Sequence, residues 1–283
     1  MGGKQSECTH GGIWPHTVGM YPVVFRVGSF EVTSFGLMVA LGALVGLWML
    51  RREARRSGLP ADTGDVGMWA LAGGILGAKL LFVAEHAHEG DLSALLLARG
   101  GLSWFGGLGG GLAAGTFAMW RRNLPFLRVF AAATPGLAVG QAIGRIGCLL
   151  VGDDYGRPTT LPWGIAFPEG LPPTSARVHP TQLYEAVFLG ALAFVLVGGR
   201  KRGRSDTEVA GLYLVSVGAF RFLLEFIRVN PRVALGLTTA QWASVAVVVR
   251  EHSFSCVRGV GAFSSPDPPR GSASITIPGS DPS

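Results

Sequence analysis

The sequence predicts an all-α fold, a polytopic membrane bundle of about seven transmembrane helices. Only 15% of the 283 residues are charged, whereas soluble domains carry about 25%. The mean hydropathy is +0.39, so the chain has too few ions to cover a water-facing surface. A membrane-spanning helix needs about 20 mostly apolar residues, and we predict spans at 30–50, 64–85, 101–120, 129–151, 180–199, 209–229 and 234–249.

The charges between these segments set their direction. Short basic stretches follow the first, third and fifth segments, at 51–56, 121–128 and 200–204, and together they hold eleven Lys and Arg residues. Such stretches concentrate on the cytoplasmic side. We therefore expect the N-terminus and the long 152–179 loop on the outer side. The net charge of +6 is then explained by basic residues in the cytoplasmic loops. We therefore expect no nucleic-acid partner.

Three regions follow from this pattern. Residues 1–29 form an outer N-terminal segment, 30–249 form the transmembrane domain, and 250–283 form a tail rich in Ser, Pro and Gly, which we expect to be disordered. The composition changes abruptly inside the last span, which suggests the hypothesis of a frameshift or truncation. The three cysteines are scattered, so they support neither a disulfide framework nor a CxxC metal site. We expect no metal and no cofactor.

The glycines occur at helix-contact spacing. Gly73 and Gly77 are four residues apart, and so are the members of two longer series. Small residues at this spacing let helix backbones approach closely in lipid. We therefore predict close helix packing along these faces. The two longer series are Gly107, Gly111 and Gly115, and Gly136, Gly140 and Gly144.

Charged side chains inside the predicted spans are the residues that indicate a functional site. Each costs about 2.5–3.5 kcal/mol at a helix centre on insertion scales. With the predicted topology, most of the polar residues of the spans lie toward the outer leaflet. Arg221, Glu225 and Arg228 recur at i, i+4 and i+7, which predicts one face of one helix. The ions inside the spans are Lys79, Arg145, Arg221, Glu225 and Arg228.

Guanidiniums held by a carboxylate form a clamp for an anion. The planar fork of arginine donates two parallel hydrogen bonds to a phosphate. At the outer surface of a membrane, the available anion is a phospholipid headgroup. An Arg–Glu network that only locks the helices together is the alternative interpretation.

Six ordered blocks resemble the bacterial phosphatidylglycerol–prolipoprotein diacylglyceryl transferase family. The resemblance covers about residues 28–248, with each block in the expected span and orientation. The blocks are SFGLM (34–38), GLSWFGG (101–107), GRIGCLLVGDDYGRP (144–158), VHPTQLYE (178–185), FRFLLEFIRVNP (220–231) and LTTAQWAS (237–244).

This resemblance implies a multi-pass enzyme of the bacterial cytoplasmic (inner) membrane, with a periplasmic N-terminus and an active site facing the periplasm. The family transfers the diacylglyceryl group of phosphatidylglycerol to the thiol of a lipobox cysteine in a prolipoprotein signal peptide. Glycerol phosphate leaves. The implied partners are therefore phosphatidylglycerol, the signal peptide and the bilayer, and the implied process is lipoprotein biosynthesis.

The resemblance also implies residue roles. Arg145 and Arg221 hold the phosphate, and Glu225 orients an arginine. Together with His179, these residues form the implied catalytic set. The implied substrate-binding set is Arg145, Cys148, Asp153, Gly156, Gln182, Tyr184, Glu185, Arg228, Gly106 and Gly107.

Three positions depart from the family pattern. Phe105 replaces the histidine that usually precedes the two glycines, Phe35 replaces a tyrosine, and Cys148 replaces an asparagine. A phenylalanine cannot take a proton, so the base that accepts the thiol proton is sought among His179, Glu225 and Asp153. Two other functions stay open: a paralogue with altered or lost activity that binds phospholipid or uses another acceptor, and a non-catalytic lipid-binding or transport protein.

Overall fold

Helices make up most of the described structure. The computed structural model describes residues 23–27, 30–88, 91–97, 101–230, 236–242 and 244–245. The six long helices are α1 (Ser34–Arg56), α2 (Thr63–Glu85), α4 (Trp104–Arg121), α5 (Phe126–Val151), α6 (Thr181–Lys201) and α7 (Asp206–Leu224), and α3 (Leu92–Leu97) is short. Five of these, α1, α2, α5, α6 and α7, are long and apolar enough to cross a membrane.

The sixth long helix, α4, coincides with the predicted third span but is not among the five that are long and apolar enough to cross a membrane. Its 18 residues include six glycines, and it ends at Arg121. The predicted seventh span, 234–249, is described only in part. Its described part, 236–242 and 244–245, contains only short helical stretches. The chain is thus a helical membrane protein, and the described residues account for six of the seven predicted segments as long helices.

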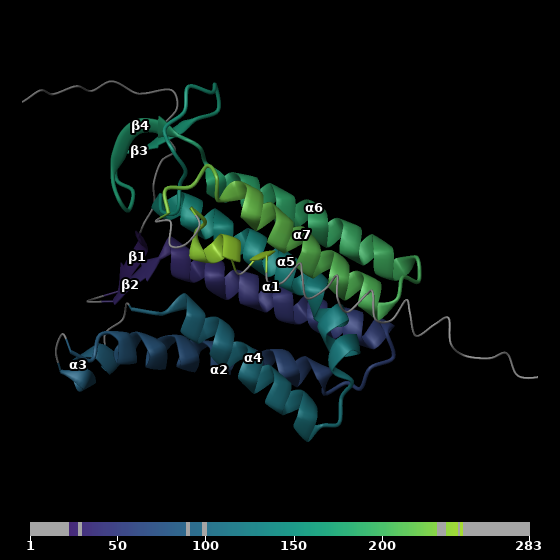
Figure 1. Ribbon diagram of the computed structural model, residues 1–283. Coiled ribbons are helices and arrows are strands. Elements are labelled where there is room, and N and C mark those ends of the chain that lie inside the picture. Colours follow the sequence, from purple (N-terminus) through teal and green to yellow (C-terminus); the bar gives the residue numbers. More distant parts are fainter. Residues whose placement is uncertain are drawn as a thin grey trace, which may run out of the picture.

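The helices form two groups that run in nearly the same direction (Figure 1). In the first group, α5 packs against α1, α6 and α7. In the second, α2 packs along α4, and α2 also touches α1. Large apolar side chains point outward from both groups; Phe194 on α6 is 83% exposed and Leu44 on α1 is 66% exposed. A water-facing surface does not carry so many, whereas a lipid-facing surface does.

Glycines bring the helix backbones together, as the spacing predicted. A Cβ on Gly77 would lie 2.4 Å from the carbonyl oxygen of Gly106, and one on Gly136 would lie 2.6 Å from that of Gly46. The α2–α4 and α1–α5 contacts therefore depend on glycine at these positions. Gly144 is different, because nothing lies within 4 Å of the position its Cβ would take.

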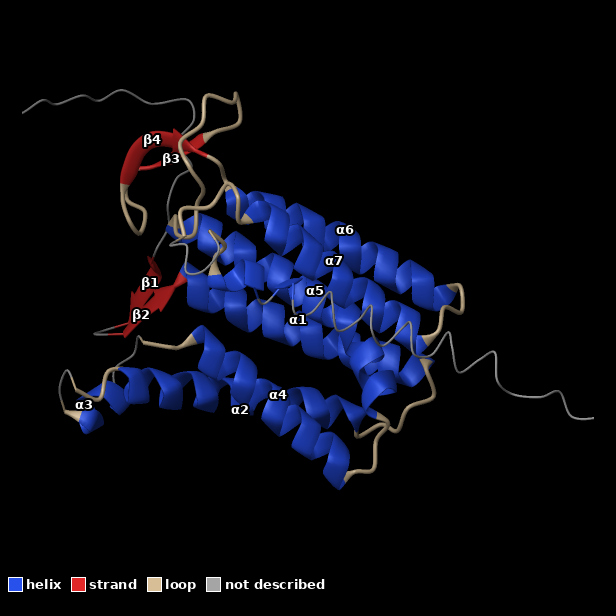
Figure 2. Cartoon of the chain, viewed as in Figure 1, coloured by secondary structure: helices blue, strands red, loops and turns tan. Residues whose placement is uncertain are grey.

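Two small hairpins cap one end of the bundle (Figure 2). β1 (Val23–Val27) pairs antiparallel with β2 (Phe30–Thr33), and β3 (Ile165–Phe167) pairs antiparallel with β4 (Thr174–Val178). The first hairpin corrects the predicted start of the first span. Residues 30–33 form a strand, and the Thr33 side chain caps α1 by accepting a hydrogen bond from Gly36 N at 3.1 Å.

The helix ends also differ from the prediction elsewhere. α1 continues through the basic run 51–56, which was predicted as a loop, because its Glu53 is buried and pairs with Arg56 and Arg200. α7 stops at Leu224, five residues before the predicted end. α5 ends where Gly152 adopts a left-handed conformation, with φ of 71°. The predicted tail, 250–283, and residues 1–22 lie outside the described residues.

Candidate active site

Six charged residues meet at the hairpin end of the bundle, where α5 ends, α6 begins and α7 ends. They come from three helices and from the loops that follow α5 and α7. Every member pairs with at least one other member, so the six form a continuous network. We call this network the arginine cluster; it consists of Arg145, Asp154, Glu185, Arg221, Glu225 and Arg228.

Glu185 is the centre of the arginine cluster. Its Oε2 lies 2.6 Å from Arg145 Nε and 3.9 Å from Arg228 Nη1, and its Oε1 accepts a hydrogen bond from Arg221 Nη1 at 3.2 Å. The carboxylate side chain is only 8% exposed. A buried charge is stable only when it is paired and hydrogen-bonded. Glu185 therefore ties the ends of α5 and α7 to α6.

Glu225 holds the other side of Arg221. Its side chain is fully buried, and its Oε2 lies 3.1 Å from Arg221 Nη2. Asn230 Nδ2 donates a hydrogen bond of 2.6 Å to Glu225 Oε1. The guanidinium of Arg221 is thus fixed between two carboxylates. The predicted i, i+4 pairing of Arg221 with Glu225 is present in the structure.

Arg228 reaches the arginine cluster by a route that the sequence pattern did not predict. The prediction that Arg228 shares a helix face with Arg221 and Glu225 is wrong, because α7 ends at Leu224. Beyond it the chain turns and forms an antiparallel bridge between Arg228 and Gly156. From this bridge Arg228 Nη2 donates a hydrogen bond to Asp154 Oδ1. Its side chain is 4% exposed, and neither Nε nor Nη1 has a hydrogen-bond partner.

Gly156 makes this bridge possible. A Cβ at this position would lie 2.7 Å from the carbonyl oxygen of Ile227 and 2.9 Å from the Cβ of His179. Its N–H donates to the carbonyl of His179 at 2.9 Å. Only glycine leaves room for the three segments to meet here. Gly156 therefore acts on the cluster through the backbone.

Asp154 is a member of the cluster that sequence reasoning missed. Its Oδ2 accepts a hydrogen bond of 2.8 Å from Arg145 Nη1, and its backbone oxygen accepts one of 2.6 Å from Thr181 Oγ1. Burial opposes ionisation, but the guanidiniums of Arg228 and Arg145 outweigh it and hold the pKa of Asp154 below its ordinary value. The carboxylate is therefore charged and joins two arginines.

The neighbouring Asp153 has a different environment. Burial raises the pKa of its carboxyl above the ordinary value, and its Oδ1 has no hydrogen-bond partner. Its other contacts are local. Its backbone oxygen accepts a hydrogen bond from Gln182 Nε2, and the thiol of Cys148 lies close enough to hydrogen-bond the carboxyl. Gln182 is fully buried, and Cys148 is a buried free thiol.

His179 and Tyr184 form a second polar group beside Gly156. Trp163 Nε1 donates to the Tyr184 hydroxyl oxygen at 2.8 Å, and this hydroxyl lies 3.3 Å from His179 Nδ1. The backbone around His179 is held on both sides, since its N–H donates to Arg157 and its oxygen accepts from Gly156. These contacts link the start of α6 to the loop that precedes β3. Trp163 gave no signal in the sequence.

Gly106 and Gly107 lie in the α2–α4 contact and outside the arginine cluster. A Cβ on Gly106 would lie 2.3 Å from the carbonyl oxygen of Gly77. The nearby Phe105 is 63% exposed on α4. Other predicted polar residues are also placed elsewhere: Lys79 stacks over Phe82 on α2, and Gln241 Nε2 donates to the backbone oxygen of Phe222 at 3.4 Å.

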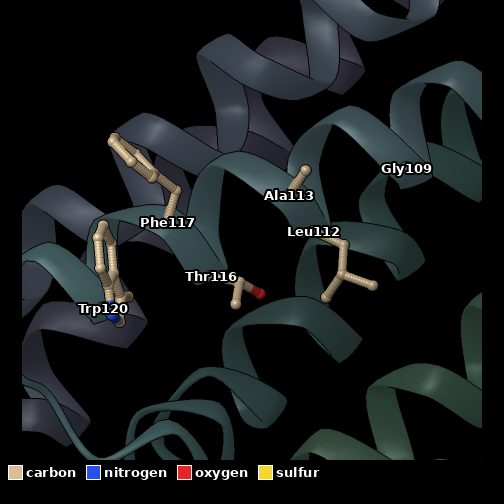
Figure 3. A pocket seen from close by; sticks show the side chains of 6 residues that line it. All are labelled: Gly109, Leu112, Ala113, Thr116, Phe117 and Trp120. Carbon is tan, nitrogen blue, oxygen red and sulfur yellow. The ribbon is translucent and has the colours of Figure 1, made fainter.

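An apolar groove of about 520 Å³ lies along α4 (Figure 3). All of its lining residues belong to this helix, and none is charged. The groove is therefore separate from the arginine cluster. Its lining residues are Gly109, Leu112, Ala113, Thr116, Phe117 and Trp120.

The geometry of the cluster suits an anion. Arg228 Nε and Nη1 are buried and make no hydrogen bond within the protein, although Nη1 lies 3.9 Å from Glu185 Oε2. A buried donor without a hydrogen bond costs about 1–3 kcal/mol. An anion with several oxygens satisfies such donors. Within the described ranges, no three His, Cys, Asp or Glu side chains are grouped so that they could hold a metal ion.

Comparison with known proteins decides the family. The family model described as prolipoprotein diacylglyceryl transferase matches residues 22–255. The chain belongs to this family. The match includes every residue of the arginine cluster and both hairpins.

Relatives with the name phosphatidylglycerol–prolipoprotein diacylglyceryl transferase are similar over most of the chain. A protein of Geobacter sulfurreducens is 36% identical over 224 residues, which cover 76% of this chain and 85% of the relative. One of Clostridium tetani is 31% identical over 235 residues, covering 81% and 94%. One of Nitratidesulfovibrio vulgaris is 36% identical over 242 residues, covering 81% and 88%.

Proposed function

We propose that this protein transfers the diacylglyceryl group of phosphatidylglycerol to the lipobox cysteine of prolipoproteins. Family membership and the names of the relatives support the activity. The observation that carries it is the group of three guanidiniums at one end of the bundle, with two donors of Arg228 unpartnered. Such a group of donors supports binding of a lipid phosphate. The alternative of a non-catalytic lipid-binding protein has no comparable support.

The arginines assist departure of the phosphate. The cysteine sulfur forms a bond to the glyceryl carbon, the bond from that carbon to the phosphate oxygen breaks, and the electron pair leaves with glycerol phosphate. Negative charge therefore develops on an oxygen beside Arg145, Arg221 and Arg228. Donors that are fixed in advance stabilise this charge without reorganisation. Interactions that strengthen as the bond breaks lower the barrier, whereas equal binding of lipid and transition state does not.

Asp153 is our candidate for the group that accepts the thiol proton. Phe105 occupies the position where the family usually has a histidine, so another base is needed. Glu225 is fully buried and paired with Arg221, and His179 Nδ1 faces the Tyr184 hydroxyl. In the described chain, no arginine lies within ion-pair distance of Asp153, and burial raises its pKa above the ordinary value, which makes the carboxylate a stronger base.

Binding roles follow for the other predicted residues. Gln182 fixes the loop that carries Asp153, while His179 and Tyr184 link the start of α6 to the loop that precedes β3. Gly156 positions Arg228 through the backbone bridge. Gly106 and Gly107 contribute by holding α4 against α2. No cofactor enters this scheme.

We also propose seven membrane spans and a periplasmic N-terminus, with residues 30–249 as the transferase domain. Basic residues support this orientation. They occupy the last turns of α1 and α6, at the opposite end of these helices from the cluster. The active site then faces the outer leaflet of the bacterial inner membrane, where phosphatidylglycerol and the signal peptide of a translocated prolipoprotein meet.

Thiol labelling tests this orientation. Single cysteines replace Ser175 in β4 and Ala61 between α1 and α2, in a chain whose native cysteines are serine. Both positions are exposed in the structure. A membrane-impermeant maleimide added to spheroplasts is expected to label the Ser175→Cys protein, and to label the Ala61→Cys protein only after permeabilisation. The reverse pattern contradicts the proposed orientation.

The activity is tested with purified protein in vesicles that contain phosphatidylglycerol and a synthetic lipobox peptide. We expect a thioether-linked diacylglyceryl peptide by mass spectrometry and release of glycerol phosphate in equal amount. A peptide with serine in place of the lipobox cysteine is the control for the acceptor. Bound phosphatidylglycerol without product contradicts the proposed transferase function.

A further inference from the structure

The arginine cluster is electrically balanced before any lipid binds. Three guanidiniums face three carboxylates, those of Asp154, Glu185 and Glu225. A phosphodiester carries one negative charge, so its addition leaves an excess of one anion in a partly buried site. Uncompensated charge in such a site is costly. One carboxylate must therefore leave its arginines, or take up a proton, when the headgroup binds.

Two of the three carboxylates are fixed. The side chains of Glu185 and Glu225 are 8% and 0% exposed, and each lies at a helix end among several partners. Movement of either into water requires helices α6 and α7 to separate. Asp154 is different, because it lies in the loop beyond α5 and its side chain is 43% exposed. A rotation of this side chain is enough to bring its carboxylate into solvent.

The backbone of Asp154 is anchored independently of its carboxylate. Its carbonyl oxygen accepts the hydrogen bond from Thr181 Oγ1, and its φ is 62°, a left-handed conformation that aspartate, asparagine and glycine tolerate. The loop therefore keeps its shape when the carboxylate leaves. The carboxylate also pairs with Arg145 and Arg228, and Nε and Nη1 of Arg228 make no hydrogen bond within the protein.

We propose that the Asp154 carboxylate is a built-in substitute for the lipid phosphate. In the lipid-free protein it holds Arg145 and Arg228 in position, and the arriving headgroup phosphate displaces it. This inference rests on the proposed function of the cluster as a headgroup site. It makes Asp154 a positioning residue that acts through the arginines.

The exchange also assists product release. When phosphatidylglycerol replaces Asp154, the cluster stays balanced. The departing glycerol phosphate is a monoester and carries about 1.5 to 2 negative charges near pH 7. The returning carboxylate competes with it for Arg145 and Arg228. Asp154 therefore weakens the binding of both lipid and product and accelerates turnover.

Asp154→Asn tests this exchange, because it removes the charge and tolerates the left-handed backbone. Asp154 makes two partly exposed ion pairs, and the loss of two such pairs changes an affinity about two- to thirtyfold, so we expect KM for phosphatidylglycerol to fall by about this factor. We expect kcat to fall as well, and inhibition by added glycerol phosphate to strengthen by a similar factor. Asp154→Gly is expected to give the same pattern, since glycine also suits this backbone.

The matched control is Asp206→Asn. Asp206 also pairs with an arginine, Arg200, and its side chain is 37% exposed, but it lies at the opposite end of the bundle. We expect the Asp206→Asn protein to have the same KM for phosphatidylglycerol, and the same inhibition by glycerol phosphate, as the unaltered protein. Because phosphatidylglycerol binding to protein in nanodiscs is measured in parallel, a variant with low turnover still reports its affinity.

A higher KM and weaker lipid binding in folded Asp154→Asn overturns the proposal, since Asp154 then only supports the arginines. Unchanged KM and unchanged product inhibition overturn it too. These results differ from failure of the proposed function, in which the unaltered protein neither binds phosphatidylglycerol nor forms the thioether.

Discussion

At the scale of single residues, each guanidinium of the arginine cluster depends on carboxylates from other elements. Arg221 lies between Glu185 and Glu225, and Arg145 lies between Glu185 and Asp154. Their planar forks are therefore held in fixed directions. A lysine in either position keeps the charge but offers a compact ammonium in place of the fork.

We expect Arg145→Lys and Arg221→Lys each to lower kcat/KM for phosphatidylglycerol by about 10²-fold, the cost of removing one fixed donor from a developing anion. Steady-state assays with the lipobox peptide measure this loss. Arg200→Lys at the opposite end is the control, with activity per folded molecule retained. Full activity in both cluster variants contradicts the assignment of the phosphate site.

Asp153→Asn is expected to move stability and activity in opposite directions. The raised pKa of Asp153 means that its favourable contribution to stability is present at acid pH and is lost as the pH rises through that value. The neutral amide avoids this loss, so the melting temperature near pH 7 should rise. The amide cannot accept a proton, so Asp153→Asn should lower kcat by about 10²-fold and remove the acid limb of the pH–rate profile. An unchanged acid limb excludes Asp153 as the base.

The sequence predicted the members of the cluster that lie in apolar segments. Arg145, Arg221 and Glu225 are costly there, so their presence alone indicated a site. Asp154 lies in a loop next to another aspartate, where neither hydropathy nor periodicity distinguishes the two. Only the fold shows that one carboxylate binds two arginines and that its neighbour binds none.

At the scale of helices, the apolar segments predicted where helices form but not where they end. Ends depend on partners that are distant in the sequence. α1 gains its last turns because Glu53 meets Arg200 on α6, and the chain leaves α7 early because Arg228 bridges to Gly156. The glycine spacing carried more information, since the same residues mark the α2–α4 and α1–α5 contacts.

Gly77→Ala tests these contacts. The added methyl would lie 2.4 Å from the carbonyl oxygen of Gly106, so the two helices must separate. Overpacking of this kind typically costs about 1–3 kcal/mol, and we expect a lower melting temperature in detergent. Gly190→Ala in α6 is the control, because nothing lies within 4 Å of its added methyl. Equal melting temperatures for the two variants contradict the close approach of α2 and α4.

At the scale of the whole molecule, a second ion network closes the end of the bundle opposite the arginine cluster. Glu53 on α1 is 3% exposed and lies 2.9 Å from Arg56 Nη1 and 3.3 Å from Arg200 Nε. This network joins α1 to α6, two helices that otherwise meet through α5. Loop charge predicted the basic side, but the buried glutamate that organises it was not predicted.

We expect Glu53→Gln to destabilise the protein by about 3–5 kcal/mol, the cost of leaving a buried partner charge uncompensated. Thermal unfolding in detergent measures the effect, and transferase activity per folded molecule should persist because the site lies at the other end. Glu31→Gln is the control. Its pair with Arg26 is exposed, so the melting temperature should barely change. Equal effects of the two substitutions contradict the role of Glu53.

The proposed transferase function is tested most directly by the transfer reaction itself, followed with phosphatidylglycerol and a lipobox peptide. We expect the proposed transferase to form one diacylglyceryl thioether on the peptide cysteine for each glycerol phosphate released, and to react about 10²-fold more slowly as Arg221→Lys. Folded protein that binds phosphatidylglycerol but forms no thioether contradicts this function.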